Sequence, residues 1–141
     1  MLPILDIWTG GSVYQLLDFR RNMRNSLNIK YAIVGEFDEK IIKYVEKKVG
    51  DKLDPHDSLY KGDYWLFRKE SPELNVELKM NVDPMHDPES DPKEEYYFDY
   101  ENRDCDLLLD IDGDPETVKT FSSKVAENPN FRLILSENYT W

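Results

Sequence analysis

The sequence predicts an α+β fold: a mostly antiparallel sheet with about three helices packed on one face, ferredoxin-like in part. Three observations predict this class. The length of 141 residues suits one domain, residues 1–141. Strand-like and helix-like segments are mixed along the chain. Finally, residues 74–82 alternate strictly between apolar and polar, which is typical of a sheet with one covered and one wet face.

The first third of the chain favours two strands separated by a helix. Residues 4–8 predict a short strand. A helix over about 10–27 follows, because Ser12 and Gln15 have capping-box spacing and apolar residues recur with helical periodicity. The alternating segment 29–37 then predicts the second strand.

A second helix and a loop are expected next. Asp38 can cap a helix, and Gly50 suits the position just past its end. The buried stripe of this helix consists of Ile41, Ile42, Val45 and Val49. Residues 51–62 are predicted to form a loop.

The rest of the chain predicts four strands, one helix and a closing strand. The four strands are 63–69, 74–82, 95–101 and 105–112. Asp114 at the cap and Pro115 at the first helical position then open a helix, which Asn128-Pro129 closes. The segment 131–135 predicts the last strand, followed by a tail.

The negative charge is concentrated in one segment. The formal net charge is −11, yet residues 83–116 hold 14 acids and two bases, a net charge of −12. The remaining residues hold 15 acids and 16 bases and are nearly neutral. This balance disfavours direct binding to nucleic-acid phosphates and favours a basic partner.

Other general features narrow the class of protein. Apolar runs are too short to span a membrane, so we expect no membrane association. The single cysteine, Cys105, excludes an internal disulfide framework, and its place among leucines predicts a small buried hydrophobe. We expect a cytoplasmic protein without a cofactor.

The string LLLDIDGD, residues 107–114, resembles the first motif of the haloacid-dehalogenase-type phosphatases. The resemblance implies that Asp110 attacks phosphorus, that Asp112 handles the proton and that both help to hold magnesium. In the family this motif lies on the first strand of a parallel sheet and continues with Thr. Here Asp114 takes the Thr position, and the printed chain has only 27 further residues in which to build parallel strands. We therefore treat the resemblance as local.

The same string leaves a metal site open as an alternative. On a strand, Asp110 and Asp112 share one face about 6.6 Å apart, a spacing that can hold one divalent cation. A metal-dependent enzyme would use these two with Asp106, and with Glu77 or Asp99 from neighbouring strands. The competing interpretation is a solvated pair of carboxylates, which we favour because exposed acids far outnumber ligands.

Residues 83–101 hold the remaining unusual pattern. Asp-Pro recurs three times with a four-residue period at 83–92, which predicts a stiff, protruding connection. A run of tyrosines and one phenylalanine, interleaved with acids, follows at 95–101. If Tyr96, Phe98 and Tyr100 face inward, the intervening residues form an exposed acidic strip.

We therefore expect a small acidic protein-binding module that occupies a basic surface of a nucleic-acid-binding partner, as an inhibitor or immunity-type protein does. Charge would steer the encounter. The candidate partner-binding residues are Asp87, Glu89, Asp91, Glu94, Glu95, Tyr97, Asp99, Glu101, Asp104 and Asp106. The alternatives are the metal-dependent enzyme and a homo-oligomer in which basic helices meet the acidic segment. The basic residues on those helices are Arg20, Arg21, Arg24, Lys40, Lys43, Lys47 and Lys48.

Overall fold

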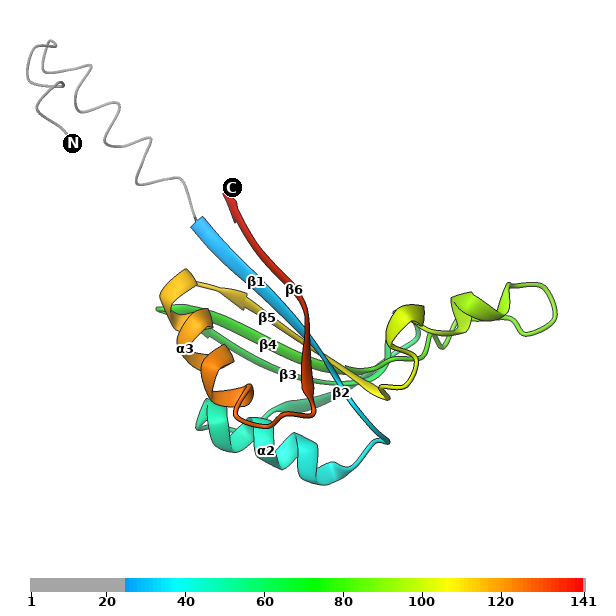
Figure 1. Cartoon of the computed structure of the whole chain (residues 1–141), viewed down its shortest axis with the longest axis horizontal. Helices are drawn as coiled ribbons and strands as arrows, with labels where there is room; N and C mark the ends of the chain where they lie inside the picture. Colours follow the sequence, from blue (N-terminus) through cyan, green and yellow to red (C-terminus); the bar gives the residue numbers. More distant parts are fainter. Residues whose placement is uncertain (1–24, 141) are drawn as a thin grey trace, which may run out of the picture.

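The computed structural model describes residues 25–140, which form an α+β fold (Figure 1). One antiparallel sheet has the strand order β2-β3-β4-β5-β1-β6. Its strands are β1 (Asn25–Ile33), β2 (Asp54–Ser58), β3 (Gly62–Glu70), β4 (Glu73–Met80), β5 (Leu107–Gly113) and β6 (Phe131–Thr140). The helices are α2 (Glu39–Val49) and α3 (Pro115–Val125), and two 3-10 turns are η2 (Lys93–Tyr96) and η3 (Tyr100–Asn102).

Both α-helices cover the same face of the sheet, and the core lies between them and the strands (Figure 1). The alternation predicted for residues 74–82 is confirmed at its start, because Leu74, Val76 and Leu78 are buried while the residues between them are partly exposed. The core side chains of the other two central strands are Leu27, Ile29, Tyr31, Ile33, Leu107, Leu109 and Ile111. The helices contribute Val45, Val118, Phe121 and Val125.

Local signals fix both helices where the sequence predicts them. The side chain of Asp38 accepts a hydrogen bond from the Lys40 amide (2.9 Å), and Gly50 ends α2 in the left-handed conformation. The carboxylate of Asp114 accepts hydrogen bonds from both the amide and the hydroxyl of Thr117, with Pro115 beginning α3. These caps satisfy amides that a helix start leaves without partners.

The structure confirms the predicted α+β class with an antiparallel sheet. It does not confirm the predicted number of helices. Residues 25–140 contain two α-helices rather than about three. The predicted strand 4–8 and helix 10–27 fall almost entirely outside the described residues. The last three residues of that helix, 25–27, belong to β1 instead, where Leu27 pairs with Gly113 of β5.

Three further predictions differ from the structure. The predicted strand 95–101 is wrong, since this segment forms parts of η2 and η3. The predicted loop 51–62 contains β2, an edge strand that tolerates Pro55 because only one of its sides is hydrogen-bonded. The last strand continues through most of the predicted tail, and β6 pairs with β1 up to Thr140.

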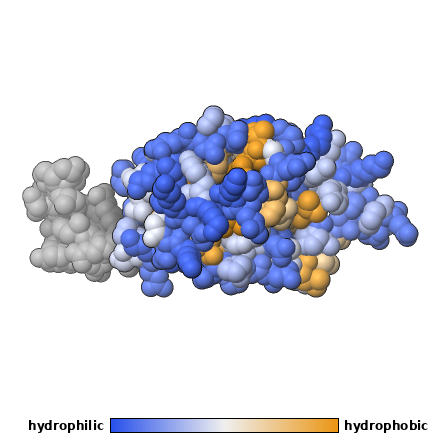
Figure 2. Space-filling model, turned by 90° about the horizontal axis from the view of Figure 1, so that it is seen from below, coloured by the Kyte–Doolittle hydropathy of each residue, from blue (hydrophilic) through white to orange (hydrophobic). Residues whose placement is uncertain are grey.

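The surface is largely hydrophilic. Figure 2 shows hydrophobic residues in small, separated patches on the face that it presents. Within the described part of the chain, no helix is long and apolar enough to cross a membrane.

Candidate functional site

The connection between β4 and β5 projects beyond the end of the sheet as an arm (Figure 1). We call residues 83–101 the acidic arm. It contains η2 and the start of η3 and carries eight carboxylates: Asp83, Asp87, Glu89, Asp91, Glu94, Glu95, Asp99 and Glu101. The sequence predicts a protruding connection between strands here, and the structure places one at this point.

The buried side chain of Asn81 joins the arm to the sheet. Its amide group donates to the backbone carbonyls of Asp99 (3.1 Å), Asn102 (3.0 Å) and Cys105 (3.2 Å). Its side-chain oxygen accepts a hydrogen bond from the Asp99 amide (2.8 Å). Because Asn81 is only 1% exposed, its own polar atoms depend on these partners, and the residue fixes the arm's base.

The aspartates of the Asp-Pro repeats organise the tip of the arm. Asp83 accepts a hydrogen bond from the Met85 amide (2.8 Å), and Asp91 accepts one from the Asp87 amide (2.9 Å). Hydrogen bonds from the Ser90 hydroxyl and the Glu89 amide hold the pKa of Asp87 below its usual value. Such local side-chain-to-backbone bonds shape turns. Hydrogen bonds accepted by its own aspartates therefore shape the tip of the arm.

Four glutamates of the arm have no such internal role. Within residues 25–140, the side chains of Glu89, Glu94, Glu95 and Glu101 are exposed and make no hydrogen bond or ion pair, and none of the arm's eight acids pairs with a lysine or arginine. Their charge is consequently available to an external cation.

Aromatic rings accompany these glutamates. Tyr96 is 42% exposed, Phe98 38% and Tyr100 41%, while Tyr97 is half-buried, which reverses the inward and outward assignment that the alternation predicts. Tyr97 contacts Tyr96 edge-on (ring centroids 5.0 Å apart) and also contacts Tyr100. We call Tyr96, Tyr97, Phe98 and Tyr100 the arm aromatics.

Two predicted partner-binding residues lie at the base of the arm and serve the fold. Asp104 receives two hydrogen bonds from the Arg132 guanidinium, which hold the pKa of this carboxyl below its usual value. Asp106 accepts a hydrogen bond from the Phe37 amide (2.7 Å). Asp104 and Asp106 are therefore engaged within the fold, and Asp99 lies at the junction held by Asn81.

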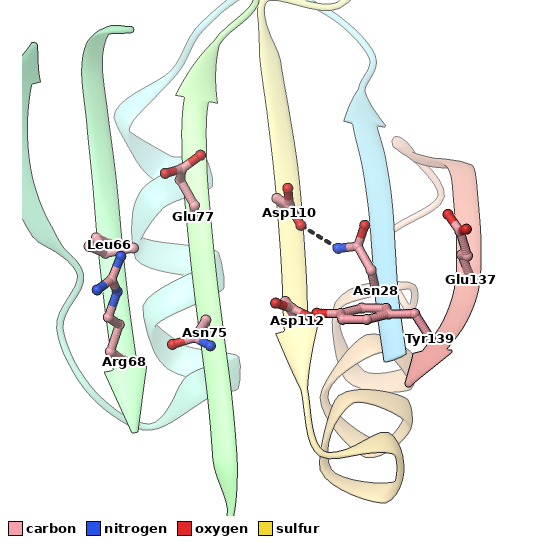
Figure 3. A pocket seen from close by; sticks show the side chains of 9 residues that line it. All are labelled: Asn28, Leu66, Arg68, Asn75, Glu77, Asp110, Asp112, Glu137 and Tyr139. Carbon is pink, nitrogen blue, oxygen red and sulfur yellow. Dashed lines mark hydrogen bonds between the residues drawn. The ribbon is translucent and has the colours of Figure 1, made fainter. Parts of the chain in front are cut away.

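The face of the sheet opposite the helices carries a second candidate site, a hollow of about 420 Å³ (Figure 3). Asp110 and Asp112 lie in it side by side along β5, on the face that the sequence predicts. The other lining residues are Asn28, Leu66, Arg68, Asn75, Glu77, Glu137 and Tyr139. Five strands supply these side chains.

The two aspartates of this hollow have partners within the chain. Asp110 accepts a hydrogen bond from the Asn28 amide group, drawn in Figure 3, and lies 3.8 Å from the Lys30 ammonium. Asp112 accepts one from the Tyr139 hydroxyl. No group of three or more side chains able to hold a metal ion occurs within residues 25–140. Antiparallel strands flank β5 on both sides, unlike the parallel sheet that the phosphatase motif requires.

We expect Asp112→Asn to lower the pKa of Tyr139. Burial, the hydrogen bond to Asp112 and the charge of that carboxylate raise this pKa to about 12. Because the fold favours the neutral phenol, the contribution to stability is complete below pH 10 and is lost as the pH rises toward 12. NMR titration of ring-labelled tyrosine measures the shift. Glu137→Gln, which alters another wall of the hollow, is the control and should leave the Tyr139 pKa unchanged.

Cys105 is fully buried, as its position among leucines predicts. Burial raises the pKa of its thiol to about 11, so it remains protonated at neutral pH and is a poor nucleophile. The cysteine is part of the packing at the arm's base.

No protein-family model matches the chain, and no curated protein matches it. The function therefore has to be inferred from the arm and the hollow themselves.

Sequence reasoning missed three residues that shape these sites: Asn81, Arg132 and Tyr139. Asn81 falls on the polar side of the segment 74–82, where the apolar/polar alternation predicts a solvent-exposed residue. Tyr139 falls in the predicted tail, because residues 136–140 show no apolar/polar alternation and join β6 by pairing with β1. Nothing local in the sequence indicates that Arg132 pairs with an aspartate 28 positions earlier.

Proposed function

We propose that the protein is a small binding module whose acidic arm occupies a basic surface of a protein partner. The observation that carries the proposal is the set of unpaired carboxylates on the arm. In the described residues the chain's own lysines and arginines leave them un-neutralised, while the arm holds them away from the sheet (Figure 1). The arm carries eight acids and one base, Lys93, and a projecting surface of strongly negative net charge attracts and orients an opposite charge.

The partner class follows from the charge. A nucleic-acid-binding protein carries a basic groove shaped for phosphates, and a projecting row of carboxylates can occupy such a groove. The protein would then act as an inhibitor or immunity-type protein. Asp104, Asp106, Asp110 and Asp112 are spread over the base of the arm and the open sheet face, where they have partners within the chain, so we assign the binding role to the arm alone.

Neutralising four arm glutamates is expected to reduce partner capture about tenfold, because charge steering commonly raises association rates by this much or more. The variant combines Glu89→Gln, Glu94→Gln, Glu95→Gln and Glu101→Gln. Affinity capture from lysate at about 0.1 M and about 1 M salt, with the captured proteins identified by mass spectrometry, measures the effect. Basic nucleic-acid-binding proteins should bind the wild type at the lower salt only.

The matched control removes the same number of exposed acids elsewhere. It combines Glu36→Gln, Asp57→Asn, Asp63→Asn and Glu70→Gln, all outside the arm. This control should capture partners as the wild type does. Equal capture by the arm variant and the control would contradict the proposal, as would capture of the chain's own copies alone, which would instead support the homo-oligomer.

We also propose that the core is a variant of the ferredoxin-like fold. The strands β4-β5-β1-β6 are adjacent in this order, α2 follows β1, and α3 joins β5 to β6. The strands β2 and β3 then extend the sheet beyond β4. This proposal concerns the fold only, since such a fold hosts many unrelated functions.

A further inference from the structure

The two edges of the sheet differ in how well they resist pairing with another strand. Short length, proline and charge keep natural edge strands from pairing. The edge strand β2 has all three, because it has five residues that include Pro55 and two aspartates. The other edge strand, β6, has ten residues without proline or lysine. In the part of the chain that the structure describes, no strand lies on the outer side of β6, so this edge is open to pairing (Figure 1).

The middle of β6 is apolar and contains a bulge. Its register against β1 shifts there, because Tyr31 opposes Leu133 while Lys30 opposes Leu135. Opposed residues of neighbouring strands point to the same face. Leu133 therefore lies on the helix-covered face with Tyr31, yet it is 57% exposed, and Leu135 lies on the open face. Ile134, the extra residue, lines a cavity of the open face together with Lys30.

The bulge gives β6 the same pattern of faces when it is read from either end. Ser136 opposes Ile29 of the core and lies on the helix-covered face, as Leu133 does. Antiparallel pairing about a twofold axis keeps each residue on its own face, so only residues that share a face can oppose each other. An axis between Ile134 and Leu135 meets this condition and sets Leu133 opposite Ser136 of the second copy. A bulge can blunt an edge by twisting it, but this one lies at the axis and twists both copies alike.

The charges of β6 fit the same arrangement. Glu137 is exposed and makes no hydrogen bond or ion pair within residues 25–140. The pairing sets it opposite Arg132 of the second copy, with both residues on the open face. The guanidinium of Arg132 has five N–H donors and gives three hydrogen bonds, to Asn102 and Asp104. It therefore keeps donors for a second carboxylate.

We propose that a second copy of this chain pairs with the outer edge of β6, antiparallel and about a twofold axis between Ile134 and Leu135. The contact joins the two six-stranded sheets into one. Its centre on the open face is apolar, and a pair of Arg132 with Glu137 lies on each side of that centre. Such an edge is smaller than a standard protein interface, so we expect a dissociation constant on the order of 10 µM. The contact uses no residue of the acidic arm, so it does not rest on the proposed function.

Sedimentation velocity of the full chain at about 1 to 200 µM measures the association. The wild type should pass from monomer to dimer across this range. Leu133→Lys should raise the dissociation constant about tenfold or more, because a lysine on an edge strand opposes pairing. Leu59→Lys is the matched control, at a residue that is 70% exposed between β2 and β3, and it should dimerise as the wild type does. Circular dichroism checks that both variants are folded.

Paired cysteines test the register. Leu133→Cys with Ser136→Cys places a cysteine opposite a cysteine of the second copy at two points, so mild oxidation should give a covalent dimer. Leu133→Cys with Asn138→Cys is the matched control, because neither of its cysteines opposes another, and it should give little covalent dimer. Non-reducing electrophoresis measures both. The native Cys105 is buried in each copy.

The outcomes separate this contact from other associations. A chain that remains monomeric at about 200 µM would overturn the inference. A dimer that Leu133→Lys leaves intact, or equal cross-linking of the two cysteine variants, would overturn it and place the contact elsewhere. Acidic arms that meet basic helices would separate at about 1 M salt, whereas edge pairing should persist. The variant with four arm glutamines should dimerise as the wild type does, so failure of one proposal leaves the other standing.

Discussion

Gly113→Ala is expected to destabilise the protein by about 3 kcal/mol or more, among the largest effects of any single methyl group in this chain. Gly113 ends β5 with φ at 144°, a backbone conformation that side-chain-bearing residues rarely adopt. A Cβ at this position would lie 2.3 Å from the carbonyl oxygen of Glu73 and 2.8 Å from its carbonyl carbon. Both atoms are backbone, so no side chain can turn away to make room.

The backbone around Gly113 has little freedom to relax. Gly113 pairs with Leu74 of β4 on one side and with Leu27 of β1 on the other. The next residue, Asp114, donates its backbone amide to the same Glu73 carbonyl (2.8 Å) and caps α3. Moving the strand ends apart would break this hydrogen bond and disturb the helix start together.

Gly50→Ala is the matched control for conformational strain. Gly50 also has a positive φ, 84°, but an added Cβ would meet nothing within 4 Å. Its substitution should cost about 1 kcal/mol, which is the strain alone. Urea unfolding followed by circular dichroism measures both variants. A Gly113→Ala variant no less stable than Gly50→Ala would contradict the steric argument.

Regular elements with a complete local signal could be predicted from the sequence. The helices α2 and α3 begin at Asp38 and Asp114 because each aspartate caps amides within three residues, a relation visible in the sequence alone. The strand β4 could be predicted because burial on one face imposes a period of two. In each case the determining contact is local or repeats with a fixed period.

Segments determined by distant contacts could not be predicted. Tyrosine-rich 95–101 has strand-forming residue types, but the amide of Asp99 bonds to Asn81 rather than to a neighbouring strand, and its carboxylate caps η3. Conversely, β2 has a loop-like composition and becomes a strand because β3 lies beside it.

The charge pattern predicted where the arm lies but not which carboxylates are paired within the fold. Counting acids located the arm, because exposed charges act through their number and position along the chain. Counting could not distinguish Glu94, which is free, from Asp104, which is bound by Arg132. That distinction depends on which side chain the fold brings opposite each carboxylate.

Asn81→Ala is expected to destabilise the protein by about 3 kcal/mol and to loosen the acidic arm. Removal of the amide takes away the partner that Asn81 supplies to the Asp99 backbone amide and to the Cys105 carbonyl, and each group left unsatisfied costs about 1–3 kcal/mol before relaxation. The carbonyls of Asp99 and Asn102 also lose a hydrogen bond but keep those from the backbone amides of Asn102 and Cys105. Hydrogen exchange of the arm amides should quicken more than that of the central strands. Urea unfolding measures the loss of stability.

Asn81→Asp is expected to cost still more, although it changes the volume very little. The carboxylate can still accept from the Asp99 amide, but it would face the carbonyls of Asn102 and Cys105 with no proton to donate and would bury a charge beside them. Asn75→Ala is the control on β4, the strand that ends just before Asn81. It lies at a half-buried position lining the open hollow and should cost less than about 1 kcal/mol.

The Asn81 variants also separate the shape of the arm from its charge. Both retain every glutamate of the arm, so a purely electrostatic interaction with a basic partner would weaken little. Recognition by shape requires the arm to be held in place, and η3 is fixed to the sheet through the Asn81 contacts to Asp99 and Asn102. Asn81→Ala should therefore reduce partner capture at about 0.1 M salt while leaving capture salt-sensitive. Capture equal to that of the wild type, together with faster exchange of the arm amides, would show that recognition does not depend on a preformed arm.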